Sequence, residues 1–374
     1  MNIQQNDNSF RAHAGDDISV KAMYQQITFD LDLDLLTGNP EIMEITEGFL
    51  NPLVKIEEFV HRAIESNDPI YNFGIIDPYD PEVGLSELGQ AIIPFFSSMA
   101  ECYDTRFDYS EYVNAFFQSL TTQYKNFNLS YGGLLLDIPG EVRTEFFNGL
   151  VTKIRETCST KDFARKIVLR RFKSKENYNR ALDFIEALFK KTSRILVLRV
   201  DFGYRAAVRG EINEISAAKH RDDFLNNTRS NAVFKNLLGY IWKFEYGKTK
   251  GHHYHFAFFY DGARVWKDSF RADQIGKCWE KITRGWGTYY NCNRSKCKYK
   301  YIGIGMINHD DIEMRENLKK AVSYLTKKDQ YLRKRLSKKM KTFQTSNFPK
   351  FSDSRVGRPR RSIDSASPDV GIKY

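Results

Sequence analysis

The stretch Tyr240–Tyr260, YIWKFEYGKTKGHHYHFAFFY, carries three of the seven histidines of this 374-residue chain. Its first part alternates apolar residues with Lys243 and Glu245, which predicts a strand with one apolar and one polar face. A short loop that begins and ends with glycine then reverses the chain. Beyond the loop, His253 and His255 alternate with aromatic residues, so the two strands together present two imidazoles and a carboxylate on one face.

This polar face predicts a metal site. Two imidazoles on alternate strand residues can bind one cation, and Glu245 would supply the oxygen ligand that Mg²⁺ or Mn²⁺ prefers. Asp201, at the end of an earlier strand, is the alternative third ligand. His252 would become a ligand if the strand shifted by one residue. The motif is short, and aromatic-rich strand pairs also carry histidines that bind no metal.

Charge divides the chain into two halves. Residues 1–160 contain 9 Lys and Arg against 25 Asp and Glu, whereas residues 161–374 contain 48 against 22. A basic half with interleaved aromatic residues indicates a polyanionic partner, most commonly nucleic acid. The five cysteines form no even framework, and neither a secretory signal nor a membrane-crossing apolar run is visible, so we expect a cytoplasmic protein with no membrane contact.

Periodicity predicts an α+β fold with four regions. Residues 1–160 would be an acidic, mainly helical region of unknown role that also contains one strand at 27–36. Residues 161–191 would be a basic helical connector, and residues 192–342 a sheet domain. Within that domain we expect a strand over 299–307 and a long helix over 312–340. Residues 343–374 have little apolar periodicity and are expected to be disordered.

The helix expected over 312–340 carries a candidate nucleophile. Tyr324 is followed by Lys327 and Lys328, which lie on its side of a helix at three- and four-residue spacing. A phenol with a pKa near 10 needs neighbouring cations and a metal that polarises the phosphorus it attacks. Tyr331 lies seven residues after Tyr324, on the same side of such a helix, and is a possible second nucleophile. Either tyrosine can instead be an interfacial aromatic on a basic helix.

The order of these motifs resembles the HUH endonuclease superfamily: the strand RILVLRVD, a strand ending in KFEYG, HHYHFAFF, and a helix with Tyr-x-x-Lys-Lys. Within it, residues 190–342 are most similar to YagK/YfjJ-type proteins and related replication initiators of inovirus-like phages and mobile elements. His253 and His255 match the His-hydrophobic-His motif, and Tyr324 with Lys327 matches the nucleophile motif. The resemblance implies an antiparallel sheet of about five strands flanked by helices, with the histidines on a central strand.

The resemblance also implies an activity. A cation on His253, His255 and Glu245 would bind the scissile phosphate of single-stranded or locally melted DNA in a bacterial host cell, and Tyr324 would attack the phosphorus. The products would be a 5′-phosphotyrosine and a 3′-hydroxyl that host replication proteins can extend, and the reverse step would rejoin strands. Lys327 and Lys328 would neutralise charge on the phosphate.

Other functions fit parts of the pattern. The tail segment Val356–Arg361, VGRPRR, resembles an AT-hook core, so Arg358 and Arg360 are candidate minor-groove contacts, although a solubilising tail would look the same. A DNA-binding regulator on the same scaffold that does not cut is the main alternative to the nickase. A zinc-dependent nucleobase deaminase is disfavoured, because the histidine strand lacks His-x-Glu and the chain has no Pro-Cys-x-x-Cys.

Overall fold

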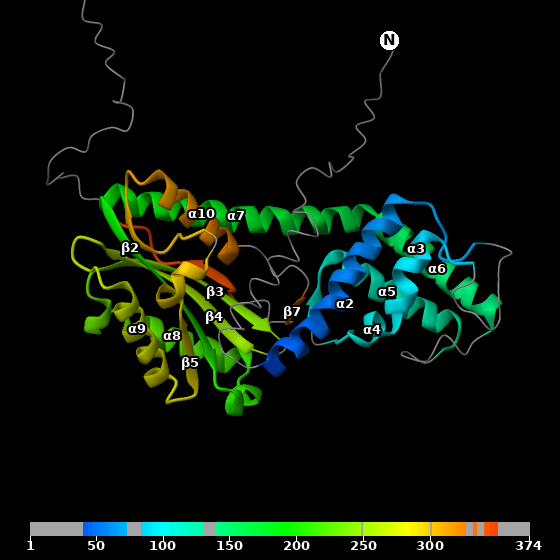
Figure 1. Ribbon diagram of the computed structural model, residues 1–374, viewed down its shortest axis with the longest axis horizontal. Coiled ribbons are helices and arrows are strands. Elements are labelled where there is room, and N and C mark those ends of the chain that lie inside the picture. The colour runs from blue at the N-terminus through cyan, green and yellow to red at the C-terminus, as the bar shows by residue number, and fades with distance from the viewer. Residues whose placement is uncertain are drawn as a thin grey trace, which may run out of the picture. The chain divides into compact units, whose positions relative to one another are not determined.

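The computed structural model describes residues 40–72, 84–105, 107–129, 139–247, 250–299, 301–326, 332–334 and 340–350. The chain forms two compact units, Met1–Thr105 with Tyr109–Phe163, and Arg106–Asp108 with Ala164–Tyr374. The first is helical in its described part and the second is built around an antiparallel sheet, so the predicted α+β class is confirmed (Figure 1). The strand expected over 27–36 lies outside the described residues.

The first unit packs helices around an aromatic core. Ser110 caps the first turn of one helix by accepting a hydrogen bond from the backbone N–H of Val113. Phe59 and Phe116 meet edge to face with their ring centres 6.2 Å apart, and both are fully buried. The helices are α2 (Pro40–Glu65), α3 (Glu87–Ile92), α4 (Phe96–Glu101), α5 (Glu111–Asn126) and α6 (Gly140–Cys158), with a 3₁₀ turn at Ile93–Phe95.

The second unit contains a six-stranded antiparallel sheet. Its strands are β2 (Arg194–Tyr204), β3 (Leu237–Gly247), β4 (Gly251–Asp261), β5 (Gly287–Asn291), β6 (Gly305–Asn308) and β8 (Phe343–Thr345). The strand order is β5-β2-β4-β3-β8, and β6 pairs with the first residues of β2. The histidine strand β4 therefore lies in the middle of the sheet.

Helices cover both faces of this sheet, as Figure 1 shows. On one face, alternate strand residues such as Phe202 and Phe256 form an aromatic core with Phe224 of α8 (Glu214–Asn227) and Trp279 of α9 (Asp268–Ile282). On the other face, Phe184 of α7 (Lys161–Lys191) packs edge to face against Phe259.

The helix α10 (Ile312–Thr326) lies along α7. The guanidinium of Arg315 donates to both carboxylate oxygens of Glu186, and lies over the ring of Phe189 at 4.8 Å. At the other end of α10, the hydroxyl of Ser174 donates to the carbonyl of Thr326 at 3.2 Å. Because α10 is held at both ends by α7, it belongs to the sheet face that α7 covers.

One edge of β2 is shared between two short strands, and an asparagine fills the gap between them. The side chain of Asn293 accepts a hydrogen bond from the backbone N–H of Arg199 at 2.9 Å and donates to the carbonyl of Val197 at 3.0 Å. It lies in a 3₁₀ segment, Cys292–Lys298. The prediction of a strand over 299–307 is wrong except at its end, because strand β6 begins only at Gly305. The side chain of Asn293 already occupies the edge of β2 at Val197 and Arg199.

Two further sequence expectations need correction. The helix expected over 312–340 ends at Thr326, and Leu332–Lys334 forms β7, which pairs with β1 (Phe107–Tyr109) in a separate two-stranded sheet. The tail expected to be disordered from residue 343 instead begins with β8, which pairs with β3. No helix in the described part of the chain has the length and apolar character needed to cross a bilayer.

Candidate metal site

Three neighbouring strands bring the polar side chains together. In the pairing of β3 with β4, Glu245 lies opposite His253 and Lys243 lies opposite His255. In the pairing of β2 with β4, Asp201 lies opposite His255. Residues directly opposite on neighbouring strands point to the same face, so the alternation read from the sequence assembles these five side chains on one face.

The neighbouring His252 belongs to the opposite face. It is 1% exposed, and its ring stacks on that of Phe244 with 5.3 Å between ring centres and 7° between planes. The strand is therefore in the register in which His253 and His255 form the pair. The alternative register, with His252 as a ligand, is wrong because it would move the apolar core residues to the polar face.

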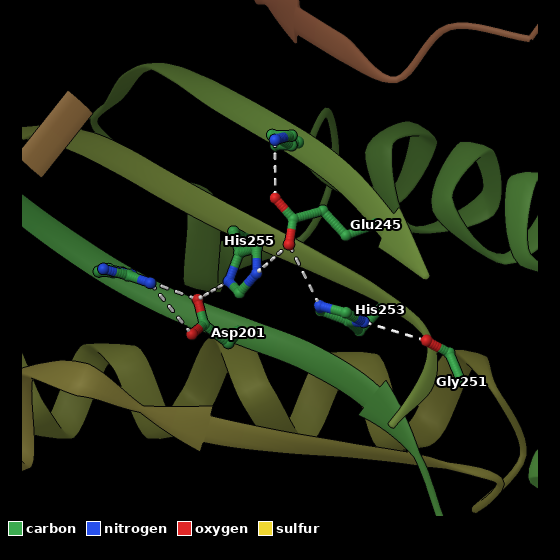
Figure 2. A network of polar contacts seen from close by, with 7 residues as sticks. Asp201, Glu245, Gly251, His253 and His255 are labelled. Carbon is green, nitrogen blue, oxygen red and sulfur yellow. Dashed lines mark hydrogen bonds and ion pairs between the residues drawn. The ribbon is translucent and has the colours of Figure 1, made fainter. Parts of the chain in front are cut away.

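Both histidines direct the same ring nitrogen toward Glu245, as Figure 2 shows. The Oε2 atom of Glu245 lies 3.5 Å from Nε2 of His253 and 3.3 Å from Nε2 of His255. Glu245, His253 and His255 each offer a ligand atom within 4.8 Å of the others. The three side chains are 25%, 11% and 12% exposed, so a small ligand can reach them.

The second nitrogen of each imidazole is already engaged. Nδ1 of His253 lies 3.0 Å from the carbonyl oxygen of Gly251, and Nδ1 of His255 lies 2.9 Å from Oδ1 of Asp201. Both partners are acceptors and lie closer than Glu245 Oε2 does to the Nε2 atoms, so a neutral ring favours the proton on Nδ1 and leaves Nε2 as the ligand atom. This arrangement, in which an acceptor fixes the tautomer of a metal-binding histidine, is typical of protein metal sites.

Two buried cations complete a row of alternating charges. Nζ of Lys243 lies 2.8 Å from Oε1 of Glu245, and Nε of Arg199 lies 3.4 Å from Oδ1 of Asp201. The row therefore reads Lys243, Glu245, His255, Asp201, Arg199. Because Lys243 engages Oε1, Glu245 has only Oε2 directed at the imidazoles, so it could bind a cation through one oxygen.

The row shifts the pKa of its members. Burial by itself would raise the pKa of Glu245, but the charges of Lys243 and His255 outweigh it and hold that pKa well below its usual range. Burial likewise opposes ionisation of Asp201, and Arg199 and His255 nevertheless lower its pKa. Burial would lower the pKa of His255, yet the two carboxylates raise it to about 9. Without a cation, His255 is therefore an imidazolium at neutral pH.

The donor set fits a divalent cation. Two imidazole nitrogens and one carboxylate oxygen leave up to three of the six positions that Mg²⁺ or Mn²⁺ prefers, and a phosphate oxygen and water could occupy them. Glu245 belongs to this set by geometry. Asp201 instead contacts the far side of the His255 ring, which suits an orienting residue better than a ligand. Sequence reasoning missed this role, although the alternation of Arg199 and Asp201 on one strand face signalled it.

The candidate nucleophile lies on the helix that covers the same face. The backbone N–H of His309, just before α10, donates to the carbonyl of Ser193, just before β2. The helix α10 and the strand β2 therefore start side by side, and both run antiparallel to α7. The 15 residues of α10 extend about 22 Å, and Asp201 lies about 23 Å along β2 from its first residue. The last turn of α10, which contains Tyr324, thus ends toward the histidine end of the sheet.

The remaining predicted site residues are not described. The side chain of Tyr324 lies outside the described part of the chain, as do Lys327, Lys328 and Tyr331. Arg358 and Arg360 in the tail also lie outside it. The site as described therefore consists of the strand residues alone.

Comparison with known proteins places this sheet in a family. The family model for the YagK/YfjJ C-terminal domain matches residues 157–346, just over half of the chain. The chain belongs to the YagK/YfjJ C-terminal domain family. The match runs from the end of α6 through β8 and includes every strand residue of the candidate metal site. Searches among curated proteins and among solved structures gave no match.

Proposed function

We propose that this YagK/YfjJ-family protein is a metal-dependent endonuclease of the HUH type. It would nick single-stranded origin DNA of a phage or mobile element and so initiate rolling-circle replication. The observation that supports this most is the convergence of the two Nε2 atoms and Glu245 Oε2, with both Nδ1 atoms engaged elsewhere. A histidine pair that serves only packing has no need of a shared carboxylate and fixed tautomers.

The cation would supply a Lewis acid that polarises the scissile phosphate. His253, His255 and Glu245 would hold it, and Tyr324 would form a bond from its phenol oxygen to phosphorus as the bond from phosphorus to the 3′-oxygen breaks. The phenol proton would leave to solvent, and the departing oxygen would take up a proton to become a 3′-hydroxyl. The phosphodiester in the DNA would be exchanged for a phosphodiester to Tyr324. The reverse step would therefore rejoin strands without a nucleotide cofactor.

Two features of the described chain support this reaction. The carbonyl of Gly251 and the carboxylate of Asp201 would keep the two ligand rings in place throughout the reaction. The course of α10 along α7 brings its last turn toward the site end of the sheet. Lys327 and Lys328, three and four residues after Tyr324, would neutralise charge on the phosphate.

An adduct assay tests this proposal. A labelled pool of random single-stranded 60-mers would be incubated with the protein and Mn²⁺, and covalent protein–DNA adducts would be resolved under denaturing conditions and sequenced. Wild-type protein should form adducts that chelator abolishes, and Tyr324→Phe should form none. Tyr331→Phe is the matched control, because it removes the same hydroxyl seven residues away. If both tyrosines act, each single variant should keep part of the signal.

One result would reject the assigned nucleophile, and another would reject the nickase itself. Adducts at wild-type level in the Tyr324→Phe protein would exclude this residue as the main nucleophile. No adduct from wild-type protein with any metal, together with metal-independent binding of duplex DNA, would favour the regulator that binds without cutting.

A further inference from the structure

The outer side of α7 carries an exposed apolar stripe. Val168, Leu169 and Phe172 are 63%, 55% and 66% exposed, although burial of such side chains normally stabilises a fold. At 100° per residue, the three positions fall within roughly 100° of the helix circumference. The opposite side of the helix, with Ala181 and Leu188, is buried within the second unit. The stripe therefore contributes nothing to the core of the unit and points to a ligand outside it.

Cations surround this stripe. The segment 163–175, FARKIVLRRFKSK, contains six Lys and Arg and no Asp or Glu. Arg165 lies on the stripe itself and is exposed. On the helix circumference, Lys166 and Lys173 lie to one side of the stripe, whereas Arg171 and Lys175 lie to the other, and all four are exposed. A surface with this charge selects a polyanion.

We propose that the segment 165–175 of α7 binds the major groove of duplex DNA, beyond the single-stranded segment that would be cut. A helix in that groove needs a central stripe that meets base edges and cations on both sides that reach the two phosphate backbones. Apolar side chains in the stripe suit the methyl groups of thymine, which only the major groove presents. The eleven residues extend about 16 Å, three turns, which suffices to follow the groove over a few base pairs.

The same features argue against a second copy of this helix as the occupant. Two such helices packed through their apolar stripes would bring cations on both flanks against cations, and like charges in proximity are unfavourable. An acidic protein with an apolar groove has the right charge, but it would not depend on thymine methyl groups. This difference allows a direct test.

This proposal concerns a second surface of the proposed nickase, separate from its metal site. DNA binding to this surface can therefore be measured without cleavage. Fluorescence anisotropy would report binding of an A·T-rich 24-bp duplex in the presence of EDTA, so the metal site is inactive. The same duplex with deoxyuridine in place of thymidine lacks only the major-groove methyl groups. Wild-type protein should bind the thymidine duplex several-fold more tightly. The double variant Leu169→Ala with Phe172→Ala should remove that preference. Alanine is a good helix former, so the exposed face of α7 should remain helical in this variant.

The contribution of the α7 lysines to DNA binding is tested with separate variants. Lys173→Gln with Lys175→Gln should weaken duplex binding about tenfold or more and lower the salt slope of log K by about two. Lys277→Gln with Lys281→Gln on α9 is the matched control, because both of these lysines are exposed on a helix of the same unit. That control should bind like wild type.

Three outcomes would overturn the proposal. Equal binding of the thymidine and deoxyuridine duplexes by wild-type protein would exclude the methyl contacts. A loss of single-stranded but not duplex binding in the lysine variant would make α7 a single-strand surface. Unchanged duplex binding in the apolar variant, with a smaller molar mass by light scattering, would make the stripe a protein interface. The adduct assay is independent of all three.

Discussion

The Oδ1 atom of Asp201 lies 2.9 Å from Nδ1 of His255, on the side of the ring opposite to Glu245. Asp201 therefore fixes both the orientation of the ring and the nitrogen that faces the site. Arg199 keeps Asp201 charged, and Asn293 anchors the backbone of Arg199. The residues that prepare the site thus extend from β4 across β2 to its edge.

Asp201→Ala should weaken Mn²⁺ binding about 10- to 100-fold, the usual effect of removing an outer partner of a metal-bound histidine. Asp201→Asn should recover part of the affinity, because its amide oxygen can still accept from Nδ1. Titration of Mn²⁺, followed by the electron paramagnetic resonance (EPR) signal of the free ion, measures both. Asp201 would prove to be a ligand itself if Asp201→Asn lost as much affinity as Glu245→Gln.

Metal binding should depend on pH through His255. Its pKa is raised to about 9, so below that pH a cation must displace a proton from the ring. Apparent Mn²⁺ affinity should therefore rise about tenfold from pH 7 to pH 8. Calorimetry in two buffers of different ionisation enthalpy would show release of about one proton at pH 7. Equal affinities at the two pH values would contradict the description of His255.

Stability of the metal-free protein should show the opposite trend. Because the folded-state pKa of His255 lies above its ordinary value, its ion pairs stabilise the fold fully below about pH 6.5. That contribution is lost as pH rises through about 9. Thermal unfolding between pH 6 and 10 measures the effect, and His255→Gln should flatten the profile.

The two adjacent histidines should respond differently to truncation. His252→Ala removes a buried ring stacked on Phe244 and should lower the free energy of unfolding by about 1–3 kcal/mol with little change in Mn²⁺ affinity. His253→Ala should weaken Mn²⁺ binding at least tenfold, because one of the two imidazole ligands is lost, with a smaller effect on stability. The four tryptophans all lie in the second unit, so their fluorescence reports unfolding of the sheet.

Asn293→Leu should destabilise the sheet unit. The change leaves the N–H of Arg199 and the carbonyl of Val197 buried without these hydrogen bonds, which costs about 2–5 kcal/mol for the pair. Urea unfolding followed by tryptophan fluorescence checks this. Asn308→Leu on β6 is the control, because Asn308 is exposed. Similar midpoints for the two variants would show that Asn293 does not hold this edge.

Part of this site could be predicted from sequence because strand alternation is a local property. The aromatic residues that alternate with His253 and His255 pack in the core on one face of the sheet. The imidazoles and Glu245 therefore lie together on the other face. The choice between Glu245 and Asp201 was not predictable, since both lie beside the same strand. Only the ring orientations distinguish the residue that faces Nε2 from the one that faces Nδ1.

The errors in the fold prediction arise from long-range pairing. The segment 299–304 has the composition of a strand, but Asn293 already occupies the neighbouring edge of β2. The segment 332–334 has the composition of a basic helix, but it pairs with β1, more than 200 residues earlier in the chain. Local periodicity carries no information about either of these long-range contacts.

The most direct test of this account is the EPR spectrum of Mn²⁺ bound to the wild-type protein, with pulsed detection of nitrogen couplings. We predict couplings from two imidazoles, reduced to one in each of His253→Ala and His255→Ala, and unchanged in His252→Ala if that variant remains folded. A spectrum of fully hydrated Mn²⁺ without nitrogen coupling, at concentrations where the protein is folded, would contradict the proposed metal site.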